Sequence, residues 1–392
     1  MVNAGAEGAA NMSMPARRPP TPRLAWLDWL RVLAVIGILV AHVGQVFMPW
    51  ADWFITNDTR SRTVGLAVFV VGPWLLPLLM LLAGFAGQYS LQRRTSGEFL
   101  WDRTRRVLIP FVAGMLVLVP PQVYVERRFH GDYDGSLLSF YPRFFTDGLY
   151  PEGDFALRHM WFLAHLFVYS AVALPLFRYW GSAAARDKLD RLANGLGDRT
   201  GWMWLALPLM AERHVTWYVV SRMGWTLEDW TGQTALLLAF IYGFALAASP
   251  RLMRIIDAQW RDALRVALVF TAVLLAFAWN GYIPARLPPS STVAALAFWT
   301  AYTFGAWAWT VAVLGLGRRH LTMETRFLVY ARRDAYSWYL LHQTVIVALA
   351  AWVVTWPAGL VLKLAGLVIS SAALTAAGAA MLNRLTRPRA SR

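Results

Sequence analysis

The sequence has no cysteine, and only 15% of its 392 residues are Asp, Glu, Lys or Arg. The absence of cysteine excludes disulfide bonds, thiolate metal sites and catalysis through a cysteinyl thioester. Ordinary globular proteins contain about 25% charged residues, so this low charge, together with 58% apolar residues, excludes a set of ordinary soluble domains. Histidine, hydroxyl and carboxylate side chains must therefore carry any chemistry.

Several motifs of soluble enzymes are missing as well. No two histidines have the H-x-x-x-H or H-E-x-x-H spacing, so we expect no metal site. Gly-rich phosphate loops and a G-x-S-x-G nucleophile elbow are also absent. Nucleotide chemistry of the soluble type and serine-hydrolase chemistry are not expected.

What the sequence does contain is typical of a polytopic, all-α membrane protein. Its 21 tryptophans and 14 tyrosines suit the two membrane interfaces, where amphipathic rings are enriched. Windows of about 20 apolar residues, the length of a membrane-spanning helix, predict about ten transmembrane helices. We place them at 29–48, 63–88, 107–125, 159–180, 201–219, 232–248, 263–281, 292–315, 335–355 and 359–382.

The basic residues predict the orientation of these spans. A net charge of +15 would suggest nucleic acid in a soluble chain, but Lys and Arg accumulate in the cytoplasmic loops of membrane proteins. With both termini cytoplasmic, 26 of the 37 basic residues fall on the cytoplasmic side. We therefore expect no nucleic-acid partner. We divide the chain into a disordered cytoplasmic tail at 1–23, a transmembrane domain at 24–384 and a short basic cytoplasmic tail at 385–392.

One predicted span contains an ionisable triplet. Glu212, Arg213 and His214 interrupt the range 201–219, and unpaired charges in hydrocarbon are costly. Either the helix ends near Met210 at the outer interface, which we favour, or the triplet faces a wet cavity.

The first span carries a stripe of ionisable side chains. Arg31 and His42 are eleven residues apart, which closes three helical turns to within about 20°, so they share one face. Asp28 lies on the same stripe and can pair with Arg31 at the cytoplasmic edge. His42 is the natural general base near neutral pH, and Arg31 is its candidate catalytic partner. A histidine bonded to a neighbouring helix and an interface arginine are the structural alternatives.

A basic pair stands at the cytoplasmic mouth of the third span. Arg103 and Arg106 are three residues apart in FLWDRTRRVLIPF, which predicts a shared helical face. Arginine suits a phosphate-bearing ligand because its guanidinium forms forked, charge-assisted hydrogen bonds. Ordinary positive-inside topology is the alternative explanation.

Two further stretches carry histidine at membrane depth. RHMWFLAHLFVYS places His159, Trp161 and His165 at the start of the fourth span, and AYSWYLLHQTVIV places Tyr339 and His342 three residues apart in the ninth. That spacing brings a hydroxyl and an imidazole to one helical face. We treat His159, Trp161, Tyr339 and His342 as supporting site residues, with buried structural histidines as the alternative.

These motifs, taken together and in this order, resemble the acyltransferase-3 family of bacterial membrane acyltransferases. Arg31-x10-His42 is similar to the family's R-x10-H signature, and Arg103-Thr-Arg-Arg106 followed by VLIP is similar to its R-x-x-R signature. LPLLMLLAGFAGQYSLQRR, HMWFL and YSWYLLH also look like family segments, and the similarity spans roughly residues 24 to 384. Within the family the chain looks most like the branch of the glucan biosynthesis protein C type, which succinylates periplasmic glucans.

The resemblance implies transfer of an acyl group, acetyl or succinyl, from cytoplasmic acyl-CoA to a hydroxyl of an extracytoplasmic carbohydrate or related acceptor. It implies His42 as the catalytic histidine and Arg103 and Arg106 on the acyl-donor side. It also implies a multi-pass protein of the bacterial cytoplasmic (inner) membrane, with acyl-CoA as co-substrate and no permanently bound cofactor. His42 could deprotonate the acceptor or carry the acyl group itself.

The main alternative is a transporter or flippase for an anionic glycan or lipid, because polar stripes also line transport routes. Such a protein usually contains inverted repeats or broken helices. No repeat is apparent, although Pro73, Pro77 and Gly84 could interrupt the second span. A membrane scaffold is hard to reconcile with polar groups deep in several spans.

Overall fold

The computed structural model describes residues 24–386 apart from 51–52, 198, 224–226 and 282–291. The predicted amino-terminal tail at 1–23 lies outside the described residues. Of the predicted tail at 385–392, the first two residues continue the last helix, and 387–392 lie outside the described residues. The described part is helical and contains no β-strand, as expected; its one β-bridge joins Leu149 to Phe155.

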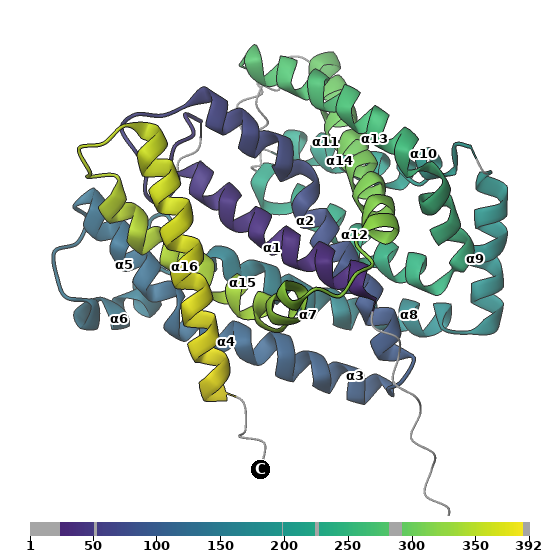
Figure 1. Ribbon diagram of the computed structural model, residues 1–392, viewed down its shortest axis with the longest axis horizontal. Coiled ribbons are helices and arrows are strands. Elements are labelled where there is room, and N and C mark those ends of the chain that lie inside the picture. The colour runs from purple at the N-terminus through teal and green to yellow at the C-terminus, as the bar shows by residue number, and fades with distance from the viewer. Residues whose placement is uncertain (1–23, 51–52, 198, 224–226, 282–291, 387–392) are drawn as a thin grey trace, which may run out of the picture.

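The helices follow one another along the chain with short connections (Figure 1). The first half comprises α1 Ala25–Gln45, α2 Arg62–Leu91, α3 Ser96–Arg103, the π-helix η1 Thr104–Leu108, α4 Ile109–Val117, α5 Val119–His130, α6 Leu137–Thr146, the 3-10 helix η2 Arg158–Met160, α7 Trp161–Val172 and α8 Leu174–Trp180. The second half comprises α9 Ala183–Leu196, α10 Gly201–Trp204, α11 Leu207–Met223, α12 Leu227–Ala248, α13 Pro250–Trp279, α14 Thr292–His320, α15 Arg326–Val353 and α16 Leu360–Thr386.

A helix lies at each of the ten ranges predicted as spans. Five described helices are long and apolar enough to cross a membrane: α1, α2, the continuous run Ser96–His130, α13 and α16. The pair from Arg158 to Trp180 makes a sixth if its two parts, bent by 53°, are one span. The chain is therefore a multi-pass membrane protein. The count of ten spans and the cytoplasmic position of both termini stay predictions.

The long helices pack around α1, which lies between α2 and α15 near the centre of the molecule (Figure 1). α12 packs along α2 at two glycines, because a Cβ on Gly84 would meet the backbone of Phe240 and one on Gly243 would meet that of Leu81. Small residues allow such close approach of membrane helices. α13 packs along α14, and α15 along α16.

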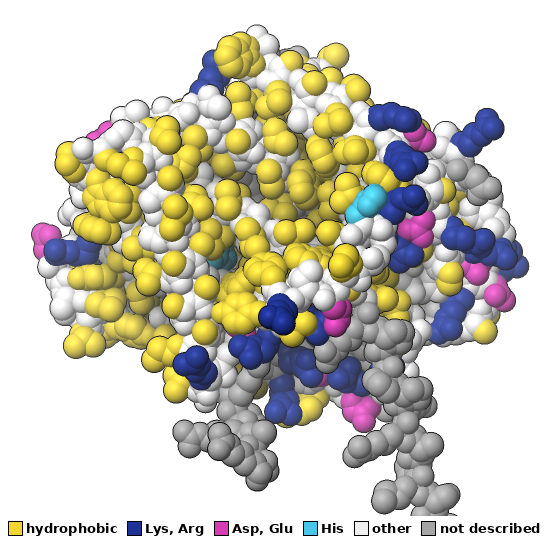
Figure 2. Space-filling view, viewed as in Figure 1, with side chains coloured by type: hydrophobic (Ala, Val, Ile, Leu, Met, Phe, Trp, Pro, Cys, Tyr) yellow, Lys and Arg dark blue, Asp and Glu magenta, His cyan; other side chains and the backbone are white. Residues whose placement is uncertain are grey.

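The surface fits a lipid environment. Figure 2 shows hydrophobic side chains spread over the middle of one face, with lysine and arginine gathered along its lower and right margins. On α16 the outward-facing side chains of Val361, Ile369 and Met381 are all more than 60% exposed. Large contiguous apolar surface of this kind marks contact with a membrane or another protein.

The ionisable triplet does not end its helix. α11 runs from Leu207 to Met223, through Glu212, Arg213 and His214, so the expectation of an end near Met210 is wrong. The polar groups are matched in part: Glu212 Oε1 accepts hydrogen bonds from Thr216 and Thr234, and His214 Nδ1 donates to the carbonyl of Met210. Glu212 Oε2 and Arg213 Nε are buried without a partner. Arg213 is buried and lines a cavity of about 50 Å³. Of the triplet, Arg213 alone lines this cavity, so the alternative of a wet cavity faced by all three residues stays a prediction.

Candidate active site

The ionisable stripe of α1 lies along one helix face and lines two cavities in succession. Asp28, Arg31 and Val35 line an inner cavity of about 440 Å³, and Ile38 and His42 line an outer cavity of about 420 Å³. The three- and four-residue steps between them keep all five on one side of the helix. The predicted shared face of Arg31 and His42 is confirmed.

His42 is oriented by its own helix. Its Nδ1 lies 3.0 Å from the carbonyl oxygen of Ile38. Because a carbonyl can only accept, Nδ1 carries the proton, and a neutral ring then leaves Nε2 with a free lone pair. The ring lies 6.2 Å from the ring of Trp53 and 5.2 Å from that of His342, between centroids. Such an imidazole can accept a proton from a group bound in the outer cavity.

Two more histidines join His42 in a cluster that sequence spacing could not predict. The rings of His342 and His159 lie 5.2 Å apart between centroids. His342 donates from Nδ1 to the carbonyl of Tyr339 at 2.6 Å, and His159 donates from Nε2 to that of Leu340 at 2.9 Å. The Tyr339 hydroxyl in turn donates to the carbonyl of His159. η2 and α15 thus bring three imidazoles to the side of α1.

The outer cavity is lined by aromatic rings and by polar atoms that lack protein partners. His342 Nε2, His159 Nδ1, Gln45 Oε1 and Arg158 Nε are buried without a hydrogen-bond partner, and their residues all line this cavity. Buried polar groups in proteins are nearly always satisfied. These atoms therefore mark the cavity as a ligand site. Aromatic side chains complete the lining: Trp53, Phe54, Tyr150, Trp161, Phe162 and Tyr339. No group of three or more potential ligand side chains suited to a metal occurs among the described residues.

A buried ion pair forms the outer rim of this cavity. Arg158 pairs with Glu126, and its guanidinium carbon lies 3.9 Å above the ring of Phe54 and 4.4 Å above that of Tyr150. Tyr150 donates to Glu126 Oε1 at 3.0 Å. Burial, and then the Glu126 carboxylate, raise the pKa of Tyr150, so this hydroxyl stays a donor. Arg158 has φ +47°, a strained conformation for a non-glycine residue.

The inner cavity is basic. Arg31 pairs with Asp28 at 3.7 Å, and Arg332 pairs with the same carboxylate at 3.6 Å. Arg106 stands at the mouth, where its side chain is 72% exposed, and pairs with Asp102 at 2.9 Å. Three guanidiniums and one carboxylate thus line the cavity, whereas Asp102 and Glu324, which pair with Arg106 and Arg332, are not part of its lining. The net positive charge of the lining favours an anion.

The predicted Arg103 and Arg106 pair is divided between two environments. The helix widens into the π-helix η1 directly after Arg103. Arg106 lines the inner cavity, whereas the Arg103 guanidinium lies 4.9 Å from the ring of Phe99 with its Nε buried and unpartnered. π-helical turns occur often at functional sites. Nothing in the sequence TRRVL signalled this turn.

The two cavities meet at two side chains. Phe162 and Tyr339 line both, and no other residue is common to the two linings. Their ring centroids are 5.6 Å apart, which is the distance of packed aromatic rings. We call these two residues the partition. It separates His42 from the arginines in this structure.

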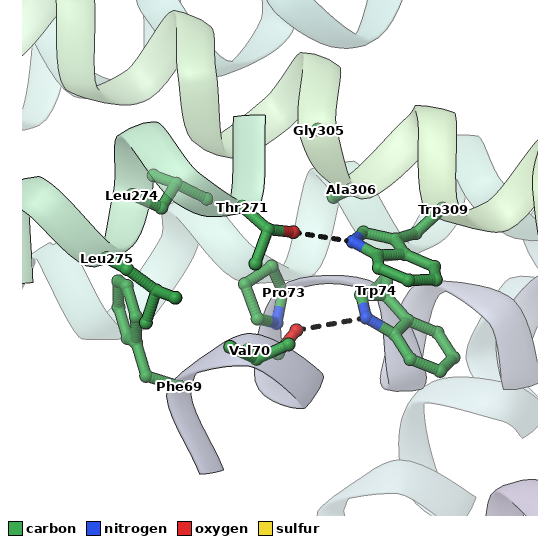
Figure 3. A pocket seen from close by; sticks show the side chains of 10 residues that line it. All are labelled: Phe69, Val70, Pro73, Trp74, Thr271, Leu274, Leu275, Gly305, Ala306 and Trp309. Carbon is green, nitrogen blue, oxygen red and sulfur yellow. Dashed lines mark hydrogen bonds between the residues drawn. The ribbon is translucent and has the colours of Figure 1, made fainter. Parts of the chain in front are cut away.

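A third pocket, between α2, α13 and α14, differs in kind (Figure 3). It holds only about 10 Å³, and its two indole groups are satisfied: Trp74 donates to the carbonyl of Val70 and Trp309 donates to Thr271 Oγ1. No ionisable side chain is among the described residues that line it. It is a packing feature beside the kink-forming Pro73 and carries no chemistry.

His159, Trp161, Tyr339 and His342, which sequence reasoning predicted as supporting site residues, all line the outer cavity. Their part in the reaction stays a prediction. His165 does not line the cavity; its Nδ1 bonds the carbonyl of Trp161 at 2.8 Å. Reasoning from sequence missed Trp53, Phe162 and the Arg158 and Glu126 pair. The only signal for the ion pair was the two opposite charges at the ends of the loop 126–158.

Comparison with known proteins gives one match. The family model described as an acyltransferase domain matches residues 24–382, which is nearly the whole chain. No curated protein and no solved structure matched in the other two comparisons.

Proposed function

Since the chain belongs to the acyltransferase-3 family and is therefore an acyltransferase, we propose that it transfers an acyl group from cytoplasmic acyl-CoA to a hydroxyl of an extracytoplasmic carbohydrate or related acceptor. The observation that carries the proposal is the free Nε2 of His42 in the outer cavity, directly across the partition from an arginine-lined inner cavity. The transporter alternative is not favoured, because the family is one of acyltransferases.

The inner cavity suits the donor. Acyl-CoA is polyanionic at its nucleotide end and apolar along its pantetheine arm. Arg31, Arg106 and Arg332 supply positive charge at the inner side, and Val35, Leu79 and other apolar side chains line the depth of the cavity. Arginine binds phosphate through forked, charge-assisted hydrogen bonds. The thioester would then lie against the partition, and Arg103, which interacts electrostatically with Arg31 and Arg106, adds to the positive charge at the inner side.

The outer cavity suits a carbohydrate. Aromatic rings stack on the apolar faces of sugar rings, while the unpartnered nitrogens of His159 and His342 accept hydrogen bonds from hydroxyls. The resemblance to the glucan biosynthesis protein C branch extends the proposal to glucans as acceptors and succinyl as the acyl group. We also propose that the protein lies in the bacterial cytoplasmic membrane.

The reaction needs one proton acceptor. His42 Nε2 takes the proton of the acceptor hydroxyl as its oxygen attacks the thioester carbonyl carbon. The new C–O bond forms, the C–S bond breaks, and the proton passes from His42 to the departing sulfur. The products are an ester and free CoA, and the imidazole returns to its neutral form. In the second route, Nε2 attacks the thioester carbonyl carbon, the C–S bond breaks, and the Nδ1 proton passes to the departing sulfur, which leaves an acyl-imidazole. The acceptor hydroxyl then attacks the acyl carbon, the C–N bond breaks, and the hydroxyl proton returns to the imidazole.

Ester formation by the purified protein tests the proposal. Full-length protein in lipid vesicles is given labelled acetyl- or succinyl-CoA and a glucan acceptor, and labelled ester is measured. In His42→Asn the amide can still donate to Ile38, but the base is lost, so we expect kcat/KM to fall by about 10²–10⁴. The same substitution at His165, which lines neither cavity, is the matched control. Undiminished activity of folded His42→Asn would overturn the mechanism.

A measurement without acceptor separates the two routes. If His42 carries the acyl group, one equivalent of CoA is released in a rapid burst before any acceptor is added. Direct attack gives no burst.

A further inference from the structure

The outer cavity contains more hydrogen-bond acceptors than one proton transfer requires. His342 is 1% exposed and His159 is 5% exposed, and each ring already donates one N–H to a backbone carbonyl. The other nitrogen of each neutral ring is therefore an acceptor, and both are buried without a partner. Together with His42 Nε2, they make three imidazole lone pairs on one cavity.

These lone pairs are on residues that line the outer cavity, and no group of the protein that the structure describes donates to them. Buried acceptors without a donor destabilise a fold, so a set of them at a ligand cavity indicates that the ligand brings the donors. His165 provides a contrast within the same helical region: its Nδ1 also bonds a backbone carbonyl, 2.8 Å away, but it lines neither cavity. The two histidine nitrogens that are buried without a partner in the described part of the chain, His342 Nε2 and His159 Nδ1, thus both belong to residues that line the outer cavity.

The spacing of the imidazole rings determines which kind of ligand can donate hydrogen bonds to them. The centroids of His42 and His342 are 5.2 Å apart, as are those of His342 and His159. Neighbouring hydroxyls on a sugar ring are about one hydrogen-bond length apart, so one hydroxyl can meet His42 while its neighbour meets His342. A ligand with one hydroxyl can donate a hydrogen bond to only one of the three nitrogens.

We propose that the acceptor is recognised as a pair of neighbouring hydroxyls. One hydroxyl gives its proton to His42 and receives the acyl group, while the adjacent hydroxyl donates to His342 Nε2 or His159 Nδ1. The inference rests on the proposed function and narrows its substrate class to compounds that contain a vicinal diol. His342 and His159 are acceptor-binding residues in this reading.

The geometry allows a reciprocal set of variants. An Asn amide reaches the Nδ1 position of histidine and a Gln amide reaches the Nε2 position. His342→Asn therefore keeps the bond to the Tyr339 carbonyl and removes the lone pair, whereas His342→Gln places an amide where the lone pair was. At His159 the two ring nitrogens have the opposite roles: Nε2 donates to the Leu340 carbonyl, and Nδ1 carries the free lone pair. His159→Gln therefore keeps the donor and removes the lone pair, whereas His159→Asn places an amide at the Nδ1 position.

The experiment compares a diol with a matched single alcohol. Full-length protein in lipid vesicles receives labelled acetyl-CoA with trans-1,2-cyclohexanediol or cyclohexanol, and kcat/KM for ester formation is measured for each. We expect the wild type to prefer the diol by about tenfold or more, because a site built to bond a hydroxyl rejects an analogue that lacks it. His342→Asn and His159→Gln should lose most of this preference, and His342→Gln and His159→Asn should retain more of it. His165→Asn should keep the wild-type ratio.

The outcomes separate this inference from the proposed function. Ester formation at equal rates on both alcohols overturns the diol inference and leaves the acyltransferase mechanism standing. The diol inference is also overturned if His342→Asn and His159→Gln both fold and both keep the wild-type preference for the diol over the single alcohol. Failure to form ester with any hydroxyl acceptor, glucan included, overturns the proposed function and the inference with it. If one position does not tolerate substitution, the reciprocal pair at the other position decides.

Discussion

The inner and outer cavities are nearly equal in volume, about 440 and 420 Å³, but opposite in chemistry. Three arginines line the inner cavity beside its apolar side chains, and its carboxylate, Asp28, is shared between Arg31 and Arg332. The outer cavity has neutral imidazoles and aromatic rings, and its arginine, Arg158, is matched by Glu126. Arginine charge thus lines one side of the partition, and histidine lone pairs without a partner line the other. The difference suits a polyanionic donor and a neutral hydroxyl acceptor.

Neutralising the outer rim should give the largest effect. In Glu126→Gln the Arg158 guanidinium loses its carboxylate partner inside the protein. Removing one member of a buried ion pair destabilises a protein by about 3–5 kcal/mol, so we expect a lower thermal unfolding temperature in detergent. Acceptor KM should rise more than acyl-CoA KM, because the pair borders the outer cavity alone.

The control for that variant is an exposed ion pair. Asp134 is paired with Arg128 at 3.4 Å and is almost fully exposed, and such pairs contribute about 0–1 kcal/mol. Asp134→Asn should leave thermal unfolding nearly unchanged. Equal destabilisation by the two variants would contradict a special role for the buried pair.

Removing one inner charge should give an intermediate effect confined to the donor. Arg31→Met leaves Asp28 paired with Arg332, so the site loses a cation without exposing a lone carboxylate. Hydrogen bonds to charged groups contribute about 1.5–3 kcal/mol, which corresponds to a roughly tenfold to hundredfold rise in KM for acyl-CoA. Acceptor KM should not change, and added salt should weaken donor binding in the wild type more than in the variant.

Arg31→Lys keeps the charge and tests the guanidinium geometry. We expect it to recover part of the lost affinity. An acceptor KM that rises as much as the donor KM would show that the two cavities are not chemically separate.

Much of this comparison could be predicted from sequence, because both the helices and the polar stripe depend on local periodicity. Each of the ten ranges that hydropathy selected contains a helix, although ten membrane spans stay a prediction, and the eleven-residue spacing of Arg31 and His42 placed them on one face. The widening at η1 and the continuation of α11 through Glu212 were not predictable in the same way. Glu212 has a tertiary partner, Thr234, that no local pattern specifies, and the sequence TRRVL carries no signal for the π-helical turn.

The three-histidine cluster shows the same limit. His159 and His342 are held by carbonyls of residues near them in space, those of Leu340 and Tyr339. For His159 that carbonyl is 181 residues away in the chain. Sequence indicated the residue types and the depth, and only the fold could show which nitrogen of each ring remains free.

The smallest expected effect concerns the partition itself. The Tyr339 hydroxyl is bonded to the carbonyl of His159, whereas Phe162 is apolar and is held by packing alone. Phe162 can therefore be replaced by a smaller apolar residue without loss of a hydrogen bond. In Phe162→Leu the thioester should meet water activated by His42 more often. We expect labelled acetyl-CoA hydrolysis without acceptor to rise about threefold to tenfold, equivalent to about 1 kcal/mol of barrier. Phe167→Leu, on the same helix but lining neither cavity, should leave hydrolysis at the wild-type rate. If Phe162→Leu hydrolyses acetyl-CoA no faster than Phe167→Leu, the two cavities are separated by something other than these two rings.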